Sequence, residues 1–315
     1  MTSEKKKIAV VIPAYNEVGN IKIMIDSLHR VFATLDYQYS LLFVDDGSKD
    51  LTLSTLKELT EQDSRLFYVE LSKNFGHQNA LKAGVDTVVD TVDAIITMDG
   101  DMQHPPELLP QLLAKWEEGF DVVYTIREED ENLSLFKKKT SRGFYNLMNY
   151  LSEVKFEPGT ADFRLMDQRV AKVFSSFSEN ELFIRGLINW LGFRQYGITF
   201  QPAKRFAGES KYTVKKMLRF ALQGITSFST RPLYLAVLLG LFITLVSFIG
   251  YLVYILFSIY HGHVISGWAS LISTVVFFGG LNLIVLGIIG IYVGKLFMQS
   301  KARPNCLIRD TNYKN

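Results

Sequence analysis

The most informative chemical motif in this 315-residue chain is Asp99-Gly100-Asp101, which directly follows a short apolar run. Two carboxylates at positions i and i+2 after a strand can turn toward one cation, and Gly100 permits the tight backbone that this needs. Mg²⁺ and Mn²⁺ prefer such oxygen ligands and keep coordination positions open for diphosphate oxygens. The motif predicts a divalent-metal site at Asp99 and Asp101, although an isolated Asp-x-Asp is often only a solvated turn.

Three further groups of polar residues also follow apolar, strand-like runs. They are Pro13-Ala14-Tyr15-Asn16-Glu17, Asp45-Asp46-Gly47-Ser48 and the basic residue Arg127. In an open parallel sheet, ligands bind beyond the carboxyl ends of the strands. Each group alone fits a turn, but four of them at one edge of one sheet, counting the Asp99 motif, predict a binding site.

The elements that must position these groups alternate along the first half of the chain. Short apolar, β-branched runs predict strands at residues 8–12, 41–44, 66–71, 94–98 and 122–125. Amphipathic stretches between them predict helices at residues 18–35, 51–61, 78–89 and 106–118. This alternation predicts an α/β fold with a mostly parallel sheet and helices on both faces.

Several common catalytic and phosphate-binding motifs are missing from the sequence. No Gly-x-Gly-x-x-Gly follows the first predicted strand, and no Walker-type phosphate loop occurs. Phosphates must then be held by a metal and by basic side chains, for which Arg127, Arg205 and Lys211 are candidates. The absence of a Gly-x-Ser-x-Gly nucleophile elbow weakens a hydrolase interpretation.

Charged residues are distributed unevenly, because residues 232–294 contain no Asp, Glu, Lys or Arg. Average composition would place roughly 15 charged residues in such a stretch. The apolar blocks 232–260 and 268–297 are each long enough to cross a bilayer core of about 30 Å as a helix. Basic residues on both outer flanks place these flanks in the cytoplasm by the positive-inside rule. They are Lys211, Lys215, Lys216, Arg219 and Arg231 before the pair, and Lys295, Lys301 and Arg303 after it.

Residues 213–229 combine apolar side chains at helical spacing with Lys215, Lys216 and Arg219. A basic amphipathic helix beside a membrane span is typical of a helix that lies in the membrane interface. An ordinary helix packed on the catalytic core remains the alternative interpretation.

The overall composition narrows the compartment and the partners. The net charge of +2 comes without a Lys/Arg-rich face interleaved with aromatics, so no nucleic-acid partner is expected. A single cysteine, Cys306, excludes an intramolecular disulfide and a cysteine-based zinc cluster. The apolar run after the charged N-terminus stops at Pro13 and is too short for a signal peptide, so the N-terminal part is expected in the cytosol.

Taken in order, the motifs resemble those of the inverting glycosyltransferases of family 2, which have the nucleotide-diphospho-sugar transferase (GT-A) fold. Other segments resemble the polyprenyl-phosphate branch of that family, as does the C-terminal hairpin. These segments are Asn74-Phe75-Gly76-His77, Asp162-Phe163-Arg164-Leu165 and Gly208-Glu209-Ser210-Lys211-Tyr212. Residues 207–239 are most similar to the members of the branch that transfer glucose.

The resemblance implies roles for individual residues. The nucleotide base and ribose would be surrounded by Pro13, Tyr15, Glu17 and Asp46, with Asp45 beside them. Asp99 and Asp101 would hold Mg²⁺ or Mn²⁺, with Gly100, Met102 and Gln103 next to the nucleotide sugar. The diphosphate or the lipid phosphate would be approached by Arg127, Arg205 and Lys211. Asp162 and Arg164 would lie near the acceptor, unless they only form an ion pair that locks a loop.

The implied reaction is inverting transfer of a hexose from a nucleotide sugar, with UDP-glucose expected, to undecaprenyl or another polyprenyl phosphate. Mannose, N-acetylglucosamine and an amino-arabinose are the rival sugars. A processive polysaccharide synthase is less well supported, because the chain lacks Gln-x-x-Arg-Trp and further spans, and an inactive scaffold would have lost carboxylates that are present here.

The expected organisation is a cytosolic catalytic domain (1–212), a juxtamembrane helix (213–231), two transmembrane helices (232–297) and a cytosolic tail (298–315). The resulting enzyme would be a multi-pass protein of the cytoplasmic (inner) membrane. A homo-oligomer is an expectation of the resemblance alone.

Overall fold

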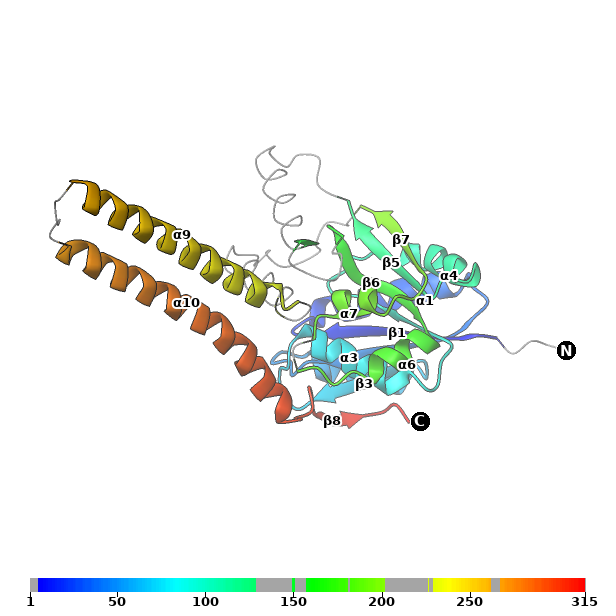
Figure 1. Ribbon diagram of the computed structural model, residues 1–315. Coiled ribbons are helices and arrows are strands. Elements are labelled where there is room, and N and C mark those ends of the chain that lie inside the picture. Colours follow the sequence, from blue (N-terminus) through cyan, green and yellow to red (C-terminus); the bar gives the residue numbers. More distant parts are fainter. Residues whose placement is uncertain are drawn as a thin grey trace.

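The computed structural model describes residues 5–128, 149–150, 157–180, 182–201, 226, 229–261 and 267–314 (Figure 1). It shows an α/β domain from which a long pair of antiparallel helices projects. The predicted site residues Arg205 and Lys211 lie outside the described residues. Of the predicted helix 213–229, the structure describes only Thr226 and Ser229.

Eight strands of the described residues form one mixed sheet in the order β7-β5-β6-β4-β1-β2-β3-β8. Their bounds are β1 Lys7–Ala14, β2 Gln38–Asp45, β3 Leu66–Leu71, β4 Ala94–Thr97, β5 Val122–Arg127, β6 Thr160–Asp167, β7 Gln195–Phe200 and β8 Ile308–Thr311. β1 pairs in parallel with β2 and β4, β2 with β3, and β5 with β7. β6 is antiparallel to β4 and β5, and β8 is antiparallel to β3. Because β6 runs opposite to both neighbours, β5 points the same way as β4. The carboxyl ends of β1, β2, β4 and β5 therefore meet at one edge.

Helices cover both faces of this sheet, and their buried side chains form two clusters. One face carries α1 (Val18–Phe32), α2 (Thr52–Gln62) and α4 (Leu109–Glu117, preceded by the 3₁₀ turn η1, Pro106–Leu108). The other face carries α3 (His77–Val88), α6 (Gln168–Ser175) and α7 (Ile184–Trp190).

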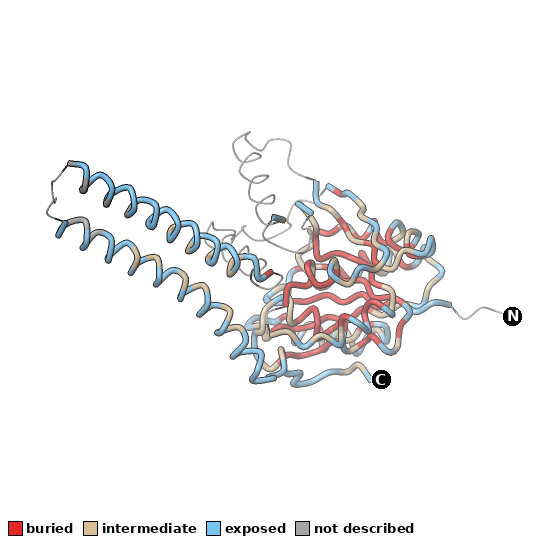
Figure 2. The backbone as a smooth tube through the Cα atoms, in the orientation of Figure 1, coloured by how far each residue is buried: buried red, intermediate tan, exposed pale blue. Residues whose placement is uncertain are grey.

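Strand β1 separates the two clusters, since side chains alternate between the faces of a strand. Val10 and Ile12 pack with the α1 side, whereas Ala9 and Val11 pack with the α3 side. Figure 2 shows the result as a buried sheet between less buried helices.

The predicted fold class is confirmed, and each of the five predicted strands and four predicted helices is present. The predicted helix 106–118 is divided into η1 and α4, and α1 ends at Phe32 rather than at residue 35. The sequence patterns predicted none of β6, β7, β8, α6 and α7. β6 carries Asp162 and Arg164 within an apolar run, and β8 is fully exposed, so neither has the apolar pattern of a buried strand.

Two long helices follow the α/β domain: α9 (Arg231–His261) and α10 (Trp268–Ser300). Their most apolar parts, Arg231–Tyr254 and Thr274–Ser300, have mean hydropathies of 2.5 and 2.3, and the protein buries no part of either stretch. Figure 2 shows the projecting hairpin as almost wholly exposed. By length and composition both helices could cross a membrane, as predicted.

The end of α10 is bonded to the α/β domain. Asn180 donates from its side chain to the carbonyl of Met298 at 2.7 Å, and Gln299 donates to the carbonyl of Ser178 at 2.9 Å. Near the start of α9, the carbonyl of Ser229 accepts a 2.7 Å hydrogen bond from the Tyr292 hydroxyl of α10. This bond ties the start of α9 to α10, and Figure 1 shows both ends of the hairpin beside the domain.

The chain then returns to the sheet, because β8 pairs with β3 beyond the hairpin. Asp310 lies 3.1 Å from Lys57 and accepts a 2.8 Å hydrogen bond from the Tyr68 hydroxyl. The ring of Tyr313 packs edge-on against Phe67 at 4.8 Å between centroids. The predicted tail of residues 298–315 thus contains the last turn of α10 and an edge strand.

Candidate active site

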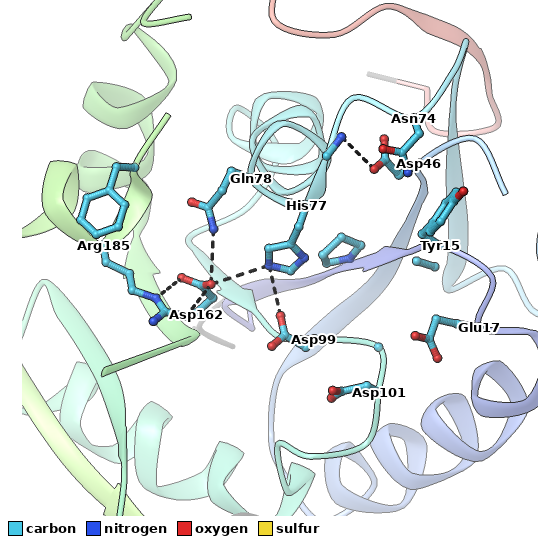
Figure 3. A pocket seen from close by; sticks show the side chains of 15 residues that line it. Tyr15, Glu17, Asp46, Asn74, His77, Gln78, Asp99, Asp101, Asp162 and Arg185 are labelled. Atoms are coloured by element: carbon cyan, nitrogen blue, oxygen red, sulfur yellow. Dashed lines mark hydrogen bonds and ion pairs between the residues drawn. The ribbon is translucent and has the colours of Figure 1, made fainter. Parts of the chain in front are cut away.

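A cavity of about 620 Å³ opens at the edge where the carboxyl ends of β1, β2 and β4 meet. Figure 3 shows its side chains in two groups with a centre between them. On one wall lie Tyr15, Glu17, Asp46 and Asn74, and on the opposite wall lie Gln78, Asp162 and Arg185. His77 and Asp99 lie between these walls, with Asp101 below them in the view. The cavity therefore brings together motifs that are far apart in the sequence.

The first wall is built by the end of β2. Asp46 is buried, and its carboxylate accepts hydrogen bonds from the backbone N–H groups of Phe75 at 2.7 Å and Gly76 at 2.9 Å. Burial raises the pKa of Asp46, although these two hydrogen bonds oppose the shift. Gly47 has φ +69°, and a Cβ at that position would lie 2.6 Å from the backbone of Lys73 and Asn74. The Asp46-Gly47 pair therefore fixes the loop that leads to His77.

Asp45 is buried and does not line the cavity. One of its oxygens accepts a 3.2 Å hydrogen bond from the N–H of Ser48, and burial raises the pKa of its carboxyl. On the same wall, Glu17 is held by a 2.9 Å hydrogen bond from its N–H to Thr52. Tyr15 is 41% exposed, so its ring presents an open aromatic face.

The Asp99 motif forms the centre of the cavity. The N–H of Asp99 donates to Nδ1 of the buried His104 at 3.2 Å, and burial lowers the pKa of His104. Asp101 Oδ1 accepts a 3.1 Å hydrogen bond from the N–H of Gln103. Asp99 Oδ1 is buried and accepts no hydrogen bond from the described residues, although His77 Nε2 lies 3.2 Å away. A cation could bind this oxygen.

Asp162 is the most highly connected group of the opposite wall. Arg185 donates to its two oxygens from Nε and Nη2, both at 2.9 Å, and Gln78 approaches at 3.4 Å. Arg164 Nη2 lies 3.6 Å away. Burial alone would raise the pKa of Asp162, but Arg185, His77 and Arg164 together hold it well below its usual value. Asp162 is therefore an ionised carboxylate that is held by its neighbours.

His77 connects the centre of the cavity to this wall. Its Nε2 lies 3.2 Å from Asp99 Oδ1 and 3.7 Å from Asp162 Oδ2. Partial desolvation in the cavity opposes the imidazolium form, but the nearby carboxylates of Asp162 and Asp99 outweigh it. These carboxylates raise the pKa of His77 to about 9.

Most, but not all, of the predicted site residues that the structure describes line the cavity. Those that line it are Pro13, Tyr15, Glu17, Asp46, Asp99, Gly100, Asp101 and Asp162. Arg164 is 2% exposed and lies behind Asp162. Arg127 donates to Gln103 at 2.7 Å, but neither these two residues nor Met102 lines the cavity.

Two charged side chains of the cavity, His77 and Arg185, are not among the predicted site residues. His77 belongs to Asn74-Phe75-Gly76-His77, which served only to support the family resemblance. Arg185 is the single charge in the apolar run Leu182-Phe183-Ile184-Arg185-Gly186-Leu187-Ile188. A lone charge at the start of a mostly buried helix is the signal that could have identified it.

Comparison with known proteins places these features in a family. The sequence model of glycosyl transferase family 2 matches residues 9–175, more than half of the chain. An uncharacterized glycosyltransferase of Synechocystis sp. is 39% identical, over 96% of this chain and 95% of the relative. The bactoprenol glucosyl transferase of Shigella phage SfX is 35% identical, over 96% of this chain and 99% of the relative.

A solved structure that resembles the chain is a mannosyltransferase from Pyrobaculum calidifontis in complex with GDP-Man and Mn²⁺, with a TM-score of 0.47 and 15% identity. The structural match covers 71% of this chain and 64% of the mannosyltransferase chain. The family match spans β1 to the end of α6 and so includes the Asp46, Asp99 and Asp162 motifs that meet in the cavity. Together with the full-length relatives, it shows that the chain belongs to glycosyl transferase family 2.

Proposed function

We propose that this glycosyltransferase moves a hexose, glucose from UDP-glucose, onto undecaprenyl phosphate or a similar polyprenyl phosphate, with inversion at the anomeric carbon. The observation that carries the proposal is one cavity with a carboxylate pair at its centre, in a domain bonded to the end of an apolar helical hairpin. The 35% identity to a bactoprenol glucosyl transferase supports both the lipid and the sugar.

The donor is proposed to occupy the wall of Tyr15, Glu17 and Asp46. The exposed ring of Tyr15 suits stacking on a nucleotide base, and carboxylate oxygens suit the hydroxyl groups of a ribose. The sugar and diphosphate would then extend toward Asp99 and Asp101, in the direction of the opposite wall.

A divalent cation, Mg²⁺ or Mn²⁺, is proposed to bind Asp99 and Asp101. The buried Asp99 Oδ1, which accepts no hydrogen bond from the described residues, fits this role. No cluster of three or more protein ligands exists among the described residues, so the donor diphosphate and water would complete the coordination. When bound, the cation would offset the charge that develops on the leaving diphosphate.

The acceptor needs no strong general base, because a phosphate monoester is already ionised near neutral pH, with a second pKa of about 6. A phosphate oxygen forms a bond to the anomeric carbon, while the bond from that carbon to the diphosphate breaks and its electron pair leaves with the nucleoside diphosphate. Asp162 is ionised and engaged by Arg185. We therefore assign it a positioning role, and catalysis rests on orientation and electrostatic stabilisation.

The reaction is proposed to take place at the cytoplasmic face of the inner membrane, with α9 and α10 as a transmembrane hairpin. Both hairpin ends lie beside the catalytic domain in Figure 1, which fits an even number of crossings. The basic residues on both flanks favour the cytoplasm for that side.

A donor screen tests the reaction. Purified protein in vesicles that contain undecaprenyl phosphate is mixed with labelled UDP-glucose, GDP-mannose, UDP-N-acetylglucosamine or a UDP-amino-arabinose, with Mg²⁺ or with excess chelator. We expect a labelled lipid from UDP-glucose with Mg²⁺ only. A lipid product from a different donor would correct the sugar, and no lipid product from any donor would overturn the function.

Cysteine labelling tests the membrane topology. In a Cys306→Ser background, Gly267→Cys at the hairpin turn should react with an impermeant reagent from outside intact cells. Leu51→Cys, which is 69% exposed on the catalytic domain, should react only after lysis. The opposite labelling pattern would contradict a cytosolic active site.

A further inference from the structure

The wall of Asp162 carries two guanidinium groups. Arg185 lies 2.9 Å from the carboxylate of Asp162, and Arg164 lies 3.6 Å from it. Arginine stays protonated in proteins, so both positive charges are present whatever the protonation of a neighbouring histidine. Guanidinium groups are preferred partners of anionic oxygens such as those of a phosphate.

The two arginines differ in what they can reach. Arg164 is 2% exposed, lies behind Asp162, and donates from Nη2 to the carbonyl of Ala161 at 2.9 Å. Arg185 lines the cavity and leaves 35% of its side chain exposed. Only Arg185 can therefore touch a molecule bound in the cavity, while Arg164 supplies a buried counter-charge for Asp162.

The pair with Asp162 fixes the direction of the Arg185 guanidinium. The two contacts use Nε and Nη2, which form one edge of the planar group. A guanidinium has five N–H donors in a rigid fork, and a phosphate is a preferred bidentate partner. Asp162 thus orients the guanidinium of Arg185 on the cavity wall, and it can do so before a substrate binds.

This wall is also the one that is joined to the membrane hairpin. Ser178 and Asn180 are bonded to Gln299 and Met298 at the end of α10. Phe183 and Arg185 follow within a few residues and line the cavity. On the opposite wall, the carboxylate of Asp46 accepts its hydrogen bonds from Phe75 and Gly76, and none among the described residues joins it to the hairpin. A lipid whose phosphate lies at the membrane surface would approach from the Arg185 side.

We propose that Arg185 binds the phosphate of the lipid acceptor, and that Asp162, backed by the buried Arg164, positions Arg185 for this contact. The proposal rests on the proposed function and adds the residue that distinguishes the acceptor end of the cavity from the donor end. Arg185 binds oxygens of the acceptor phosphate and transfers no proton, so it takes part in none of the bond changes of the reaction.

The competing explanation is an ion pair that only stabilises α7. The two explanations differ in which substrate responds to a substitution. An acceptor contact affects the Michaelis constant for the lipid phosphate, whereas a structural pair affects the melting temperature and both substrates together.

The experiment compares Arg185→Gln, Arg185→Lys and the control Arg169→Gln, whose arginine is 74% exposed on α6. Initial rates are measured with undecaprenyl phosphate and with a short, water-soluble isoprenyl phosphate. The Gln variant should raise the acceptor KM about 10- to 100-fold, the range for loss of charge-assisted hydrogen bonds. The donor KM and the calorimetric affinity for UDP should change less than about threefold. The Lys variant keeps the charge but loses the forked donor geometry, so its acceptor KM should lie between those of the wild-type protein and the Gln variant. The control variant should match the wild-type protein.

Each outcome decides between the explanations. An unchanged acceptor KM in both Arg185 variants would overturn the inference, while wild-type lipid product would leave the proposed function intact. No lipid product from the wild-type protein would instead overturn the function itself. If Arg185→Gln does not fold, as judged by loss of UDP binding, Arg185→Lys carries the test, because it keeps a cation beside Asp162.

Discussion

The charge state of His77 offers a test of the centre of the site that does not depend on turnover. Asp162 and Asp99 raise the pKa of His77 to about 9 against the partial desolvation that opposes its charge. At pH 7.5 a group with this pKa is about 97% protonated, whereas a histidine with an ordinary pKa of about 6.5 is about 9% protonated. A perturbation that cancels the field of the Asp99 carboxylate should therefore lower the protonation of His77 at this pH, while the contribution of Asp162 remains.

Two changes should produce this effect. Asp99→Asn removes the charge that lies 3.2 Å from His77 Nε2, and a divalent cation bound at Asp99 opposes the same charge. Both should move the pKa of His77 down from about 9 toward its usual value. Because the pKa of His77 is raised in the folded state, its protonation stabilises the fold. This stabilisation is fully present below about pH 6.5 and is lost as the pH rises through about 9.

The assay is an NMR titration of histidine-labelled protein in micelles, with and without Mg²⁺. The chain has five histidines, and the spectrum of His77→Gln identifies the resonance of His77. Asp90→Asn is the control, because Asp90 is a mostly exposed carboxylate that pairs with Lys172. If His77 titrates near pH 6.5 in the wild-type protein, or equally in Asp99→Asn, the electrostatic reasoning about the cavity is wrong.

Three further predictions concern the metal, the packing and the C-terminal strand. Asp101→Asn should lower turnover at least about 100-fold with little change in melting temperature, because it removes a ligand that the metal needs for transition-state stabilisation; full wild-type activity in excess chelator would contradict this. Gly84→Ala should destabilise the domain by about 1–3 kcal/mol in denaturant unfolding, because its Cβ would lie 2.3 Å from Val11 Cγ1, whereas Gly19→Ala, with open space around it, should not. Removal of residues 306–315 should lower the melting temperature by several degrees and cause aggregation measured by light scattering, since it uncovers the edge of β3; an unchanged melting temperature would show that β8 contributes nothing.

The part of the fold that the sequence predicts best is the part with regular apolar patterns. The strands β1 to β5 and the helices between them have the short runs and helical spacing that burial against a sheet requires. The polar motifs at their carboxyl ends then indicate the cavity edge. Asp46 and Asp99 were placed at one edge in advance because consecutive parallel strands end on the same side.

The acceptor side could not be predicted in the same way, because its geometry depends on antiparallel pairing. β6 inserts between β4 and β5, and this places Asp162 beside His77, 85 residues earlier in the chain. Arg185 reaches Asp162 only because α7 packs on the face that α3 and α6 share. Pairings between distant segments leave no local pattern, so Arg164 was selected from its motif while the cavity-lining arginine was missed.

The pairing of β8 with β3 has a consequence for the order in which the protein is assembled. Because β8 follows α10 in the chain, the ribosome makes the outermost strand of the sheet only after both apolar helices. Until then β3 has an open edge that could pair with another chain. The last residues can close this edge only when the hairpin has turned back toward the domain. If both helices cross a bilayer, as proposed, the catalytic sheet is completed after membrane insertion, and a chain that fails to insert would keep an unfinished sheet.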